Sequence, residues 1–307
     1  MTNIIHKRSW PVNPSVRILA LTIILLGAYC LTGCSFFSRE DLTDPLVQEP
    51  PGEKEFLAQN HAAAVPLLTA AAANGNIRAV FYLRIIHERG LGGLPVNLAV
   101  ANSSLDYLAF RITVLTNLAH DSKEKERPLY QTALATLYYL GRVPAKKPDL
   151  NAALALADPA AAAGFPPAIN LMTALTLAAS PEDAPGFFAS YGPGTAYNWA
   201  SQGAELKDIL AIGNLAYLNR QGLGTPINPY LAATLTHNAA TNPFPTPRAL
   251  NDLGYIYQEG IGVTKDPAEA KRWRELAVKR GFPLALSSSS GGKEPQNISH
   301  PADYIEY

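Results

Sequence analysis

The sequence predicts an all-α protein, a right-handed superhelical solenoid built from about five antiparallel helix pairs. Two observations predict this class. A skeleton of alanine, leucine, tyrosine and glycine recurs with a period of 36 to 41 residues, and apolar runs with the period of two that strands require are not evident. The composition agrees, because 48% of the residues are hydrophobic and many of them are alanines, which let helices approach closely.

The clearest copy of the repeat runs from Ala249 to Ala285. Gly260 and Gly262 can adopt the positive φ that ends a first helix and turns the chain. Asp266 followed by Pro267 is typical of an N-cap with proline at the first position of a second helix. Each copy is therefore predicted to form a helix, a turn and an antiparallel helix.

Earlier parts of the chain repeat this spacing with decreasing regularity. Gly222 precedes Gly260 by 38 residues. The glycine pair is missing from 168–211, and 97–126 is irregular as well, so we expect distorted turns or loops there.

The repeated skeleton resembles the Sel-one-like repeat, a relative of the tetratricopeptide repeat, over about 60–285. The resemblance implies an extended concave groove lined by the first helix of each pair, and a protein or peptide partner held there. In the relatives, groove positions fall two and five residues beyond the leucine of the Leu-Gly pair. Carried onto this sequence, the expected partner-binding residues are Arg78, Phe81, Glu88, Tyr139, Tyr217, Arg220, Asn251, Tyr255 and Gln258. The alternative that Tyr217 and Tyr255 pack between repeats stays open.

An insertion at 180–194 interrupts the repeats and carries the aromatic residues Phe187, Phe188 and Tyr191. Loops on a rigid scaffold often carry binding residues, so this segment is a second candidate for partner binding. The aromatic side chains can equally cover their own repeat.

The start of the chain has the layout of a secretory signal. Basic residues up to Arg17 precede an apolar run, which ends in Leu31-Thr32-Gly33-Cys34. This ending resembles a bacterial lipoprotein signal, which implies cleavage before Cys34 and a lipid, such as palmitate, on the new N-terminus. Ser35 favours the outer membrane over the inner one. An uncleaved membrane anchor over 18–37 is the alternative, since twenty apolar residues can just span a bilayer.

These observations divide the chain into a lipoprotein signal peptide (1–33), a lipidated tether (34–55), a repeat solenoid (56–286) and a disordered tail (287–307). The tail contains the run SSSSGG, which cannot pack. The alternative that Tyr304, Ile305 and Tyr307 dock on the protein stays open.

Charge and composition argue against several functions. Without 1–33 the chain has 22 basic and 25 acidic residues, a net charge of −3, which disfavours nucleic-acid binding. No two histidines are spaced for a helical metal site, and Gly90-Leu91-Gly92-Gly93 lacks the Lys-Ser or Lys-Thr of a phosphate loop. We therefore expect no catalytic residues, metal, nucleotide or other cofactor.

The sequence favours a membrane-anchored periplasmic scaffold that binds a cell-envelope protein in the solenoid groove. A glycan-binding module and an enzyme acting on cell wall or β-lactams are the alternatives, and the second lacks a recognisable nucleophile or acid–base pair.

Overall fold

A computed structural model describes residues 46–143, 147–179, 194–282 and 305–307. These residues form α-helices, one short 3₁₀ turn and no strand, so the all-α prediction is confirmed for the part of the chain described. The expected signal peptide, Cys34 and the insertion with Phe187, Phe188 and Tyr191 lie outside these residues. Within the described ranges, no helix is both long and apolar enough to cross a bilayer.

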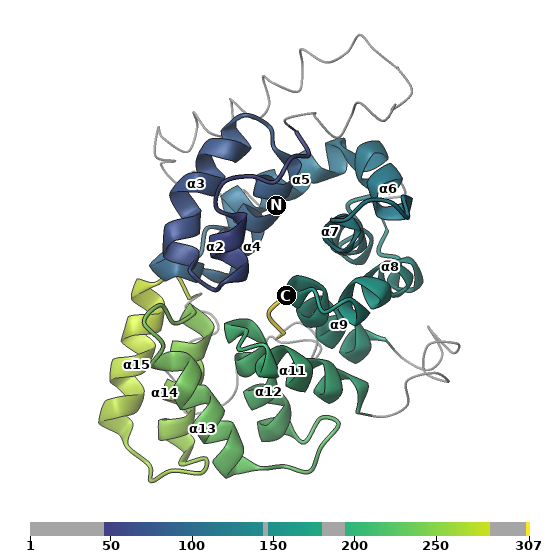
Figure 1. The fold of residues 1–307 in the computed structure, drawn as a ribbon. Coiled ribbons are helices and arrows are strands. Elements are labelled where there is room, and N and C mark those ends of the chain that lie inside the picture. The colour runs from purple at the N-terminus through teal and green to yellow at the C-terminus, as the bar shows by residue number, and fades with distance from the viewer. Residues whose placement is uncertain (1–45, 144–146, 180–193, 283–304) are drawn as a thin grey trace, which may run out of the picture.

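The described helices follow one another around the molecule in chain order (Figure 1). They are α2 (Glu53–Leu57), α3 (His61–Ala73), α4 (Ile77–Arg89), η2 (Leu91–Gly93), α5 (Leu98–Phe110), α6 (Ile112–His120), α7 (Arg127–Tyr139), α8 (Leu150–Ala162), α9 (Pro166–Ala178), α11 (Thr195–Glu205), α12 (Ile209–Gln221), α13 (Pro229–Ala240), α14 (Pro247–Glu259) and α15 (Pro267–Lys279).

Most of these helices form five pairs. The first helices are α4, α7, α9, α12 and α14, which are 13 residues long each and mostly buried. Each packs against the second helix that follows it: α5, α8, α11, α13 or α15. The predicted solenoid of helix pairs is confirmed, with α2 and α3 preceding the first pair and α6 inserted before α7.

The turn chemistry predicted from the sequence is present in the last pair. Gly260 ends α14 with φ 71°, a left-handed conformation that a residue with a Cβ rarely adopts. Asp266 caps α15 by accepting hydrogen bonds from two backbone N–H groups of its first turn. Asn97, Asp149 and Asn228 cap α5, α8 and α13, and each accepts one such hydrogen bond. The second helices α8, α13 and α15 therefore begin where the repeat spacing places them. The expectation of loops or distorted turns over 97–126 is wrong for 98–110 and 112–120, which form α5 and α6.

Small residues bring α14 and α15 into close contact. A Cβ added at Gly254 of α14 would lie 2.9 Å from the backbone oxygen of Ala270 on α15. Ala270 and Ala277 are both buried, with exposed fractions of 3% and 0%. We call this contact the stacking seam. It is formed by residues that are close in sequence.

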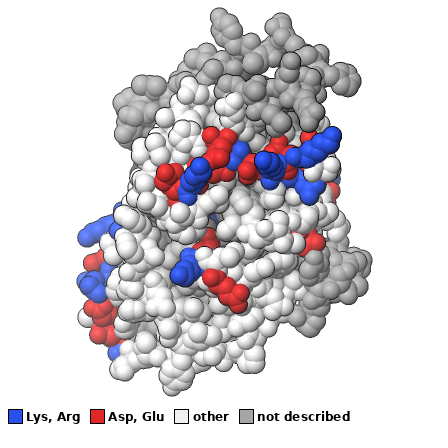
Figure 2. Space-filling view, viewed as in Figure 1, with Lys and Arg blue, Asp and Glu red and all other residues white. Residues whose placement is uncertain are grey.

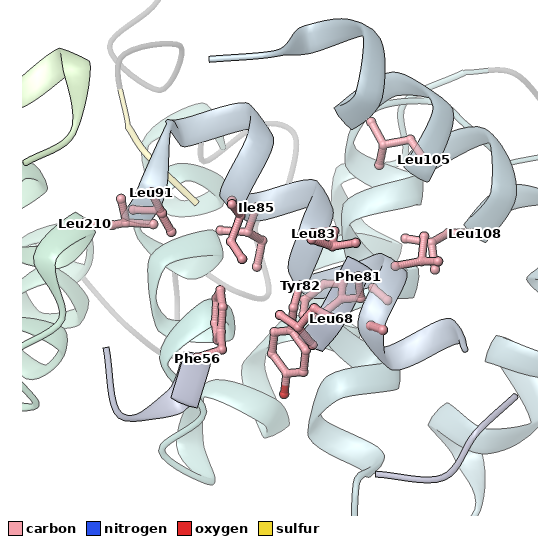
Figure 3. Packing of buried hydrophobic residues seen from close by; sticks show 14 of the residues in the cluster. Phe56, Leu68, Phe81, Tyr82, Leu83, Ile85, Leu91, Leu105, Leu108 and Leu210 are labelled. Atoms are coloured by element: carbon pink, nitrogen blue, oxygen red, sulfur yellow. The ribbon is translucent and has the colours of Figure 1, made fainter. Parts of the chain in front are cut away.

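The helix pairs curve until the last pair meets the first, so the described part of the chain forms a closed ring (Figure 1). The backbone N–H of Val96, after η2, donates to the oxygen of Arg280, after α15, at 3.1 Å. Leu210 of α12 lies beside Leu91 of η2 in the same hydrophobic cluster (Figure 3). The expectation of an extended concave groove is therefore corrected. The accumulated rotation of five helix pairs closes the curve.

The loop between α2 and α3 makes a second contact across the closure. Gln59 Nε2 donates to Asp208 Oδ2 at 3.1 Å, and the N–H of Ile209 donates to Gln59 Oε1 at 3.4 Å. Gln59 has φ 61°, which is uncommon for a residue with a side chain. We call the contacts made by Val96 and Gln59 the closure seam. They join residues up to 184 positions apart along the chain.

Charged side chains on the surface shown in Figure 2 gather in a band across the upper half and along the edge formed by α15. On α15, Arg272 pairs with Glu269 one turn away at 2.8 Å, and their side chains are 64% and 36% exposed. Exposed pairs of this kind contribute little to stability. They are typical of a solvated outer face.

Candidate functional site

The centre of the ring is occupied by the end of the chain, Ile305–Tyr307 (Figure 1). The exposed fractions of Ile305 and Glu306 are 1% and 5%, and Tyr307 is half-buried. For these three residues the expectation of a tail that does not pack is wrong. The alternative, docking of Ile305 and Tyr307, is what the structure shows, while Tyr304 lies outside the described residues.

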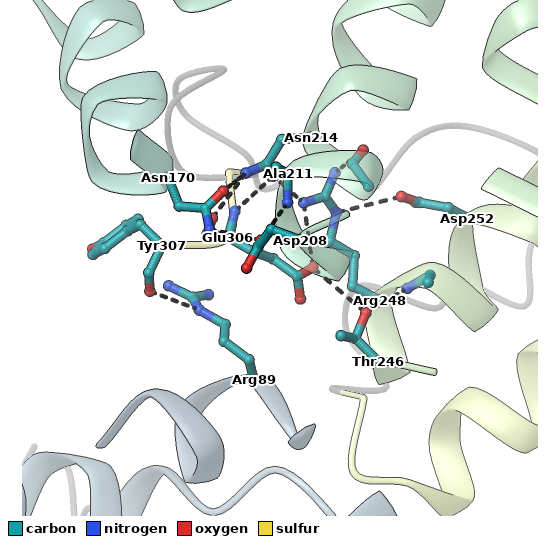
Figure 4. A network of polar contacts seen from close by, with 12 residues as sticks. Arg89, Asn170, Asp208, Ala211, Asn214, Thr246, Arg248, Asp252, Glu306 and Tyr307 are labelled. Atoms are coloured by element: carbon teal, nitrogen blue, oxygen red, sulfur yellow. Dashed lines mark hydrogen bonds and ion pairs between the residues drawn. The ribbon is translucent and has the colours of Figure 1, made fainter. Parts of the chain in front are cut away.

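Asn214 of α12 binds both the N–H and the carbonyl oxygen of Glu306 (Figure 4). The N–H of Glu306 donates to Asn214 Oδ1 at 2.9 Å, and Asn214 Nδ2 donates to the carbonyl oxygen of Glu306 at 2.8 Å. A neighbouring strand makes the same two bonds to a residue of an extended chain. The amide therefore recognises peptide backbone, whatever the side chain.

Side chains of the neighbouring first helices α14 and α9 fix the orientation of the Asn214 amide. Arg248 Nη1 of α14 donates to Asn214 Oδ1 at 2.7 Å, which identifies this atom as the acceptor. Asn214 Nδ2 also lies 3.4 Å from Asn170 Oδ1 of α9, and Asn170 Nδ2 donates to Asp208 Oδ1 at 2.9 Å. Asn214 and Asn170 have exposed fractions of 0% and 1%. The amide is therefore held ready to accept from one backbone group and donate to the other.

The side chain of Glu306 lies at the start of α14. Thr246, the N-cap of that helix, donates to Glu306 Oε2 at 3.4 Å, and Arg248 Nη1 lies 3.6 Å from the same oxygen. Burial raises the pKa of Glu306, while the positive charges of Arg248 and Arg89 oppose that rise. An acidic side chain is thus accommodated by a helix N-terminus and a buried guanidinium.

Tyr307 lies between α4 and α7. Its ring meets the ring of Tyr139 edge to face, with centroids 5.6 Å apart, and the guanidinium of Arg89 lies 4.9 Å from its centroid. Its main-chain oxygen accepts from Arg84 Nη2 and Arg89 Nε, each at 3.4 Å. An aromatic residue is therefore held by both its ring and its backbone.

Two arginines at this end, the buried Arg84 and the partly buried Arg89, share one acidic partner. Glu88 accepts from Arg84 Nη1 at 2.7 Å and from Arg89 Nη2 at 3.0 Å. Burial opposes the ionisation of Glu88, but Arg89 and Arg84 together hold its pKa below the usual value. Two positive charges thus face one carboxylate, which leaves the arginines able to bind a further acceptor.

Ile305 fills an apolar pocket between three helices. The cluster that contains it is formed by α9, α11 and α12 and consists of Ala174, Ala196, Ala200, Leu215, Tyr217 and Leu218. The small alanines leave room for one branched side chain. All five first helices therefore contribute to holding Ile305–Tyr307. We call Arg84, Arg89, Tyr139, Asn214, Thr246 and Arg248 the central site.

Several residues predicted from the sequence lie at or near the central site. Tyr139 belongs to it, and Glu88 pairs with its two arginines. Arg220 lies between the rings of Tyr217 and Tyr255, 5.5 and 4.9 Å from their centroids, and 3.8 Å from the carboxylate of Asp252. Arg248 in turn pairs with Asp252 at 3.3 Å.

Other predicted residues lie elsewhere. Arg78 is buried in an ion pair with Glu53, whose Oε2 accepts from Arg78 Nε at 2.9 Å, and Phe81 is 0% exposed against Phe165. Arg78 is covered by α2, which supplies Glu53, whereas Phe81 belongs to the hydrophobic core and its ring lies 5.9 Å from the guanidinium carbon of Arg84. Asn251 is buried, and Gln258 donates to Glu259 at 3.2 Å. Partner binding by any of these residues stays a prediction.

The sequence reasoning missed Asn214, Arg84, Arg89 and Thr246. Asn214 immediately precedes Leu215, whereas the expected positions were two and five residues beyond that leucine. The available signal was the pair Asn170 and Asn214, two asparagines in first helices, each followed directly by a leucine. A buried asparagine needs partners, so its presence indicates a polar network at the centre.

The described residues offer little space for a small molecule at the centre. One cavity there has a volume of about 10 Å³ and is lined by residues that include His61, Asp208 and Tyr307. No group of three or more His, Cys, Asp or Glu side chains within the described ranges is arranged to hold a metal ion. In this structure the central site is filled by polypeptide.

Comparison with known proteins identifies the repeats. The Sel1 repeat family model matches residues 128–165, 209–243 and 247–282, which correspond to α7–α8, α12–α13 and α14–α15. No curated protein matches this chain.

Several solved structures are similar to it, including the following two. One is a Sel1 repeat protein from Oxalobacter formigenes, with 19% identity, coverage of 76% of this chain and 86% of that chain, and a TM-score of 0.39. The other is c5321, a protective antigen of uropathogenic Escherichia coli displaying an SLR fold, with 19% identity and a TM-score of 0.40. That match covers 82% of this chain but only 50% of the c5321 chain.

Proposed function

Because the chain contains Sel1 repeats, we propose that it is a membrane-anchored scaffold of the periplasm, which binds a protein of the cell envelope at the centre of its ring. Sel1 repeat proteins generally serve as protein–protein interaction scaffolds, and the fold is typically non-catalytic. The observation that best supports the proposal is the pair of hydrogen bonds between Asn214 and the main chain of Glu306. Through these bonds Asn214 binds the peptide backbone, which is common to all proteins.

The anchoring part of the proposal rests on the sequence. Basic residues, an apolar run and the ending Leu31-Thr32-Gly33-Cys34 support lipidation at Cys34, and Ser35 supports the outer membrane as the destination. A lipid on Cys34 would attach the repeats to the membrane through the first part of the expected tether (34–55). The second part, from residue 46, belongs to the fold, because Val47 and Glu53 are buried.

Partner binding can be tested in living cells with a photo-reactive amino acid. One variant carries it in place of Tyr255, on the inner wall beside Arg220, and a matched variant carries it in place of Tyr230, which is 75% exposed on α13. We expect illumination to attach an envelope protein through position 255 and not through position 230. Equal cross-linking at the two positions, or none at position 255, would contradict partner binding at the centre.

Anchoring is tested separately by labelling cells with a palmitate analogue. We expect the wild-type chain to take up the label and to sediment with outer membranes. The Cys34→Ser variant should lose the label and accumulate as a longer precursor. A Cys34→Ser chain that is processed and located like the wild type would refute the lipid anchor.

A further inference from the structure

The central site matches the chemistry of Ile305–Tyr307 residue by residue. The apolar pocket holds Ile305, Thr246 and Arg248 meet the carboxylate of Glu306, and Tyr139 and Arg89 meet the ring of Tyr307. Asn214 binds the backbone between them. Pockets for successive side chains combined with main-chain bonds are how proteins select an extended peptide.

The polar groups of the central site also require an occupant. Asn214 is 0% exposed and makes two of its hydrogen bonds to Glu306, and Arg84 is 1% exposed beneath Tyr307. Buried polar atoms that lose their partners cost roughly 1–3 kcal/mol each. An empty site would leave these buried atoms without partners, so the site is suited to a bound peptide.

The charges around the site favour an acidic ligand. Four arginines lie around it (Arg84, Arg89, Arg220 and Arg248), against three carboxylates (Glu88, Asp208 and Asp252). The excess is one positive charge, which the carboxylate of Glu306 neutralises. A basic residue in place of Glu306 would bring a like charge next to Arg248.

From these observations we propose that the central site is a peptide-binding site for an extended segment of the type aliphatic–acidic–aromatic, and that Ile305–Tyr307 occupies it as an internal competitor of the partner. This inference rests on the proposed function and names the chemistry of the partner. A partner that presents the same three side chains would replace the three residues in the same pockets. The repeats would then bind only when the partner outcompetes the end of their own chain.

The strength of the competition follows from the covalent link. A ligand tethered to its own site competes at an effective concentration of about 1 mM. If it occupies the site for at least 90% of the time, the apparent affinity for an outside peptide falls about tenfold or more. Releasing the three residues should restore that affinity.

The test uses the full chain in detergent and a fluorescent peptide with the sequence of residues 300–307. The released-tail variant combines Ile305→Asp with Glu306→Lys, which places charge in the apolar pocket and reverses the charge next to Arg248. We expect fluorescence anisotropy to show binding of the peptide to the released-tail variant at least tenfold tighter than to the wild type. A peptide that carries the Glu306→Lys change should bind the released-tail variant at least tenfold more weakly.

Substitutions in the ring locate the binding. In the released-tail variant, Asn214→Ala should weaken peptide binding at least tenfold because both main-chain bonds are lost. Since Asn214 is fully buried, Tyr139→Ala provides a second variant, at a half-buried position of the site whose ring meets that of Tyr307. It should weaken binding about threefold or more, while Tyr230→Ala on the outer face should leave binding unchanged.

Three outcomes would overturn the inference. They are no binding of the peptide to the released-tail variant, equal binding to the wild type and the released-tail variant, and binding that is unaffected by both Asn214→Ala and Tyr139→Ala. The peptide assay needs neither the lipid nor a cellular partner. Its failure is therefore distinguishable from failure of the cross-linking and labelling experiments, which test the proposed function.

Discussion

The stacking seam and the closure seam hold the same ring together in different ways. At the stacking seam, Gly254 and Ala270 let two backbones approach, and the helices involved are joined by a short turn. At the closure seam, Gln59 and Val96 make individual hydrogen bonds between segments far apart in the chain. The difference indicates that each helix pair is stabilised locally, while the ring depends on a few long-range contacts.

The largest expected effect is at the core of the stacked pair. Leu253 of α14 is 2% exposed and belongs to the same hydrophobic cluster as Ala277 of α15. Leu253→Ala should lower the free energy of unfolding by about 3 kcal/mol, because it removes buried methyl groups and leaves a cavity. Urea unfolding followed by circular dichroism measures this. A loss below about 1 kcal/mol would show that the stacked pair contributes little.

A smaller effect is expected from backbone contact at the stacking seam. Gly254→Ala adds a Cβ 2.9 Å from the oxygen of Ala270 and should cost about 2 kcal/mol. Gly213→Ala in α12 is the matched control, because its Cβ would meet only Glu306 Oε2 at 3.8 Å. It should be neutral or gain up to about 1 kcal/mol of helix stability. Equal melting temperatures for the two variants would refute close approach at Gly254.

Acid should destabilise the folded protein by a similar amount through His61. Burial lowers the pKa of His61 to about 4, with the charge of Asp208 opposing this shift. The folded protein therefore binds a proton on His61 more weakly than the unfolded chain, whose pKa is about 6.5. Stability from His61 is complete above pH 6.5 and is lost as the pH falls towards 4, by about 2 kcal/mol at pH 5.

Thermal unfolding at pH 7 and pH 5 tests this prediction. His61→Gln should remove most of the loss between the two pH values, since glutamine does not titrate. His237→Gln, at an exposed position of α13, is the control and should leave the loss as it is in the wild type. An identical pH dependence in His61→Gln and wild type would show that His61 is not the group responsible.

The smallest effect is expected from the loop that bridges the closure. Gln59→Ala removes the hydrogen bonds to Asp208 and to the N–H of Ile209 and should cost about 1 kcal/mol. Hydrogen exchange should report it as local opening. The amide of Val96 should exchange faster, while that of Asp266, which donates to the oxygen of Tyr257 within the last pair, should not change. Equal acceleration at both amides would mean that the two seams are not independent.

Helix pairing was predictable from the sequence because its determinants are local. Gly260 and Asp266 fix where one helix ends and the next begins, and their spacing recurs along the chain. The prediction failed where it extrapolated to longer range. An extended groove was expected from the repeats, but the described helices close into a ring, in which the hydrogen bond from Val96 to Arg280 joins segments 184 positions apart.

The central site was predictable only in part for the same reason. Tyr139 was identified from repeat spacing and contacts Tyr307 as a ligand-binding residue would. Asn214 and Arg89 were missed, because their role depends on helices that meet only after the ring has closed. Repeat spacing predicts which residues share one face of a helix. It does not predict the distance between helices on opposite sides of a ring.

The sequence by itself determined that the chain folds into helix pairs, where those pairs begin and end, and which small residues let them pack, since glycine φ angles, N-caps and close helix contacts act over a few residues. Only the tertiary structure decided that the pairs close into a ring and that Ile305–Tyr307 lies at its centre. Closure depends on small rotations summed over five helix pairs, and no local pattern in the sequence reports that sum.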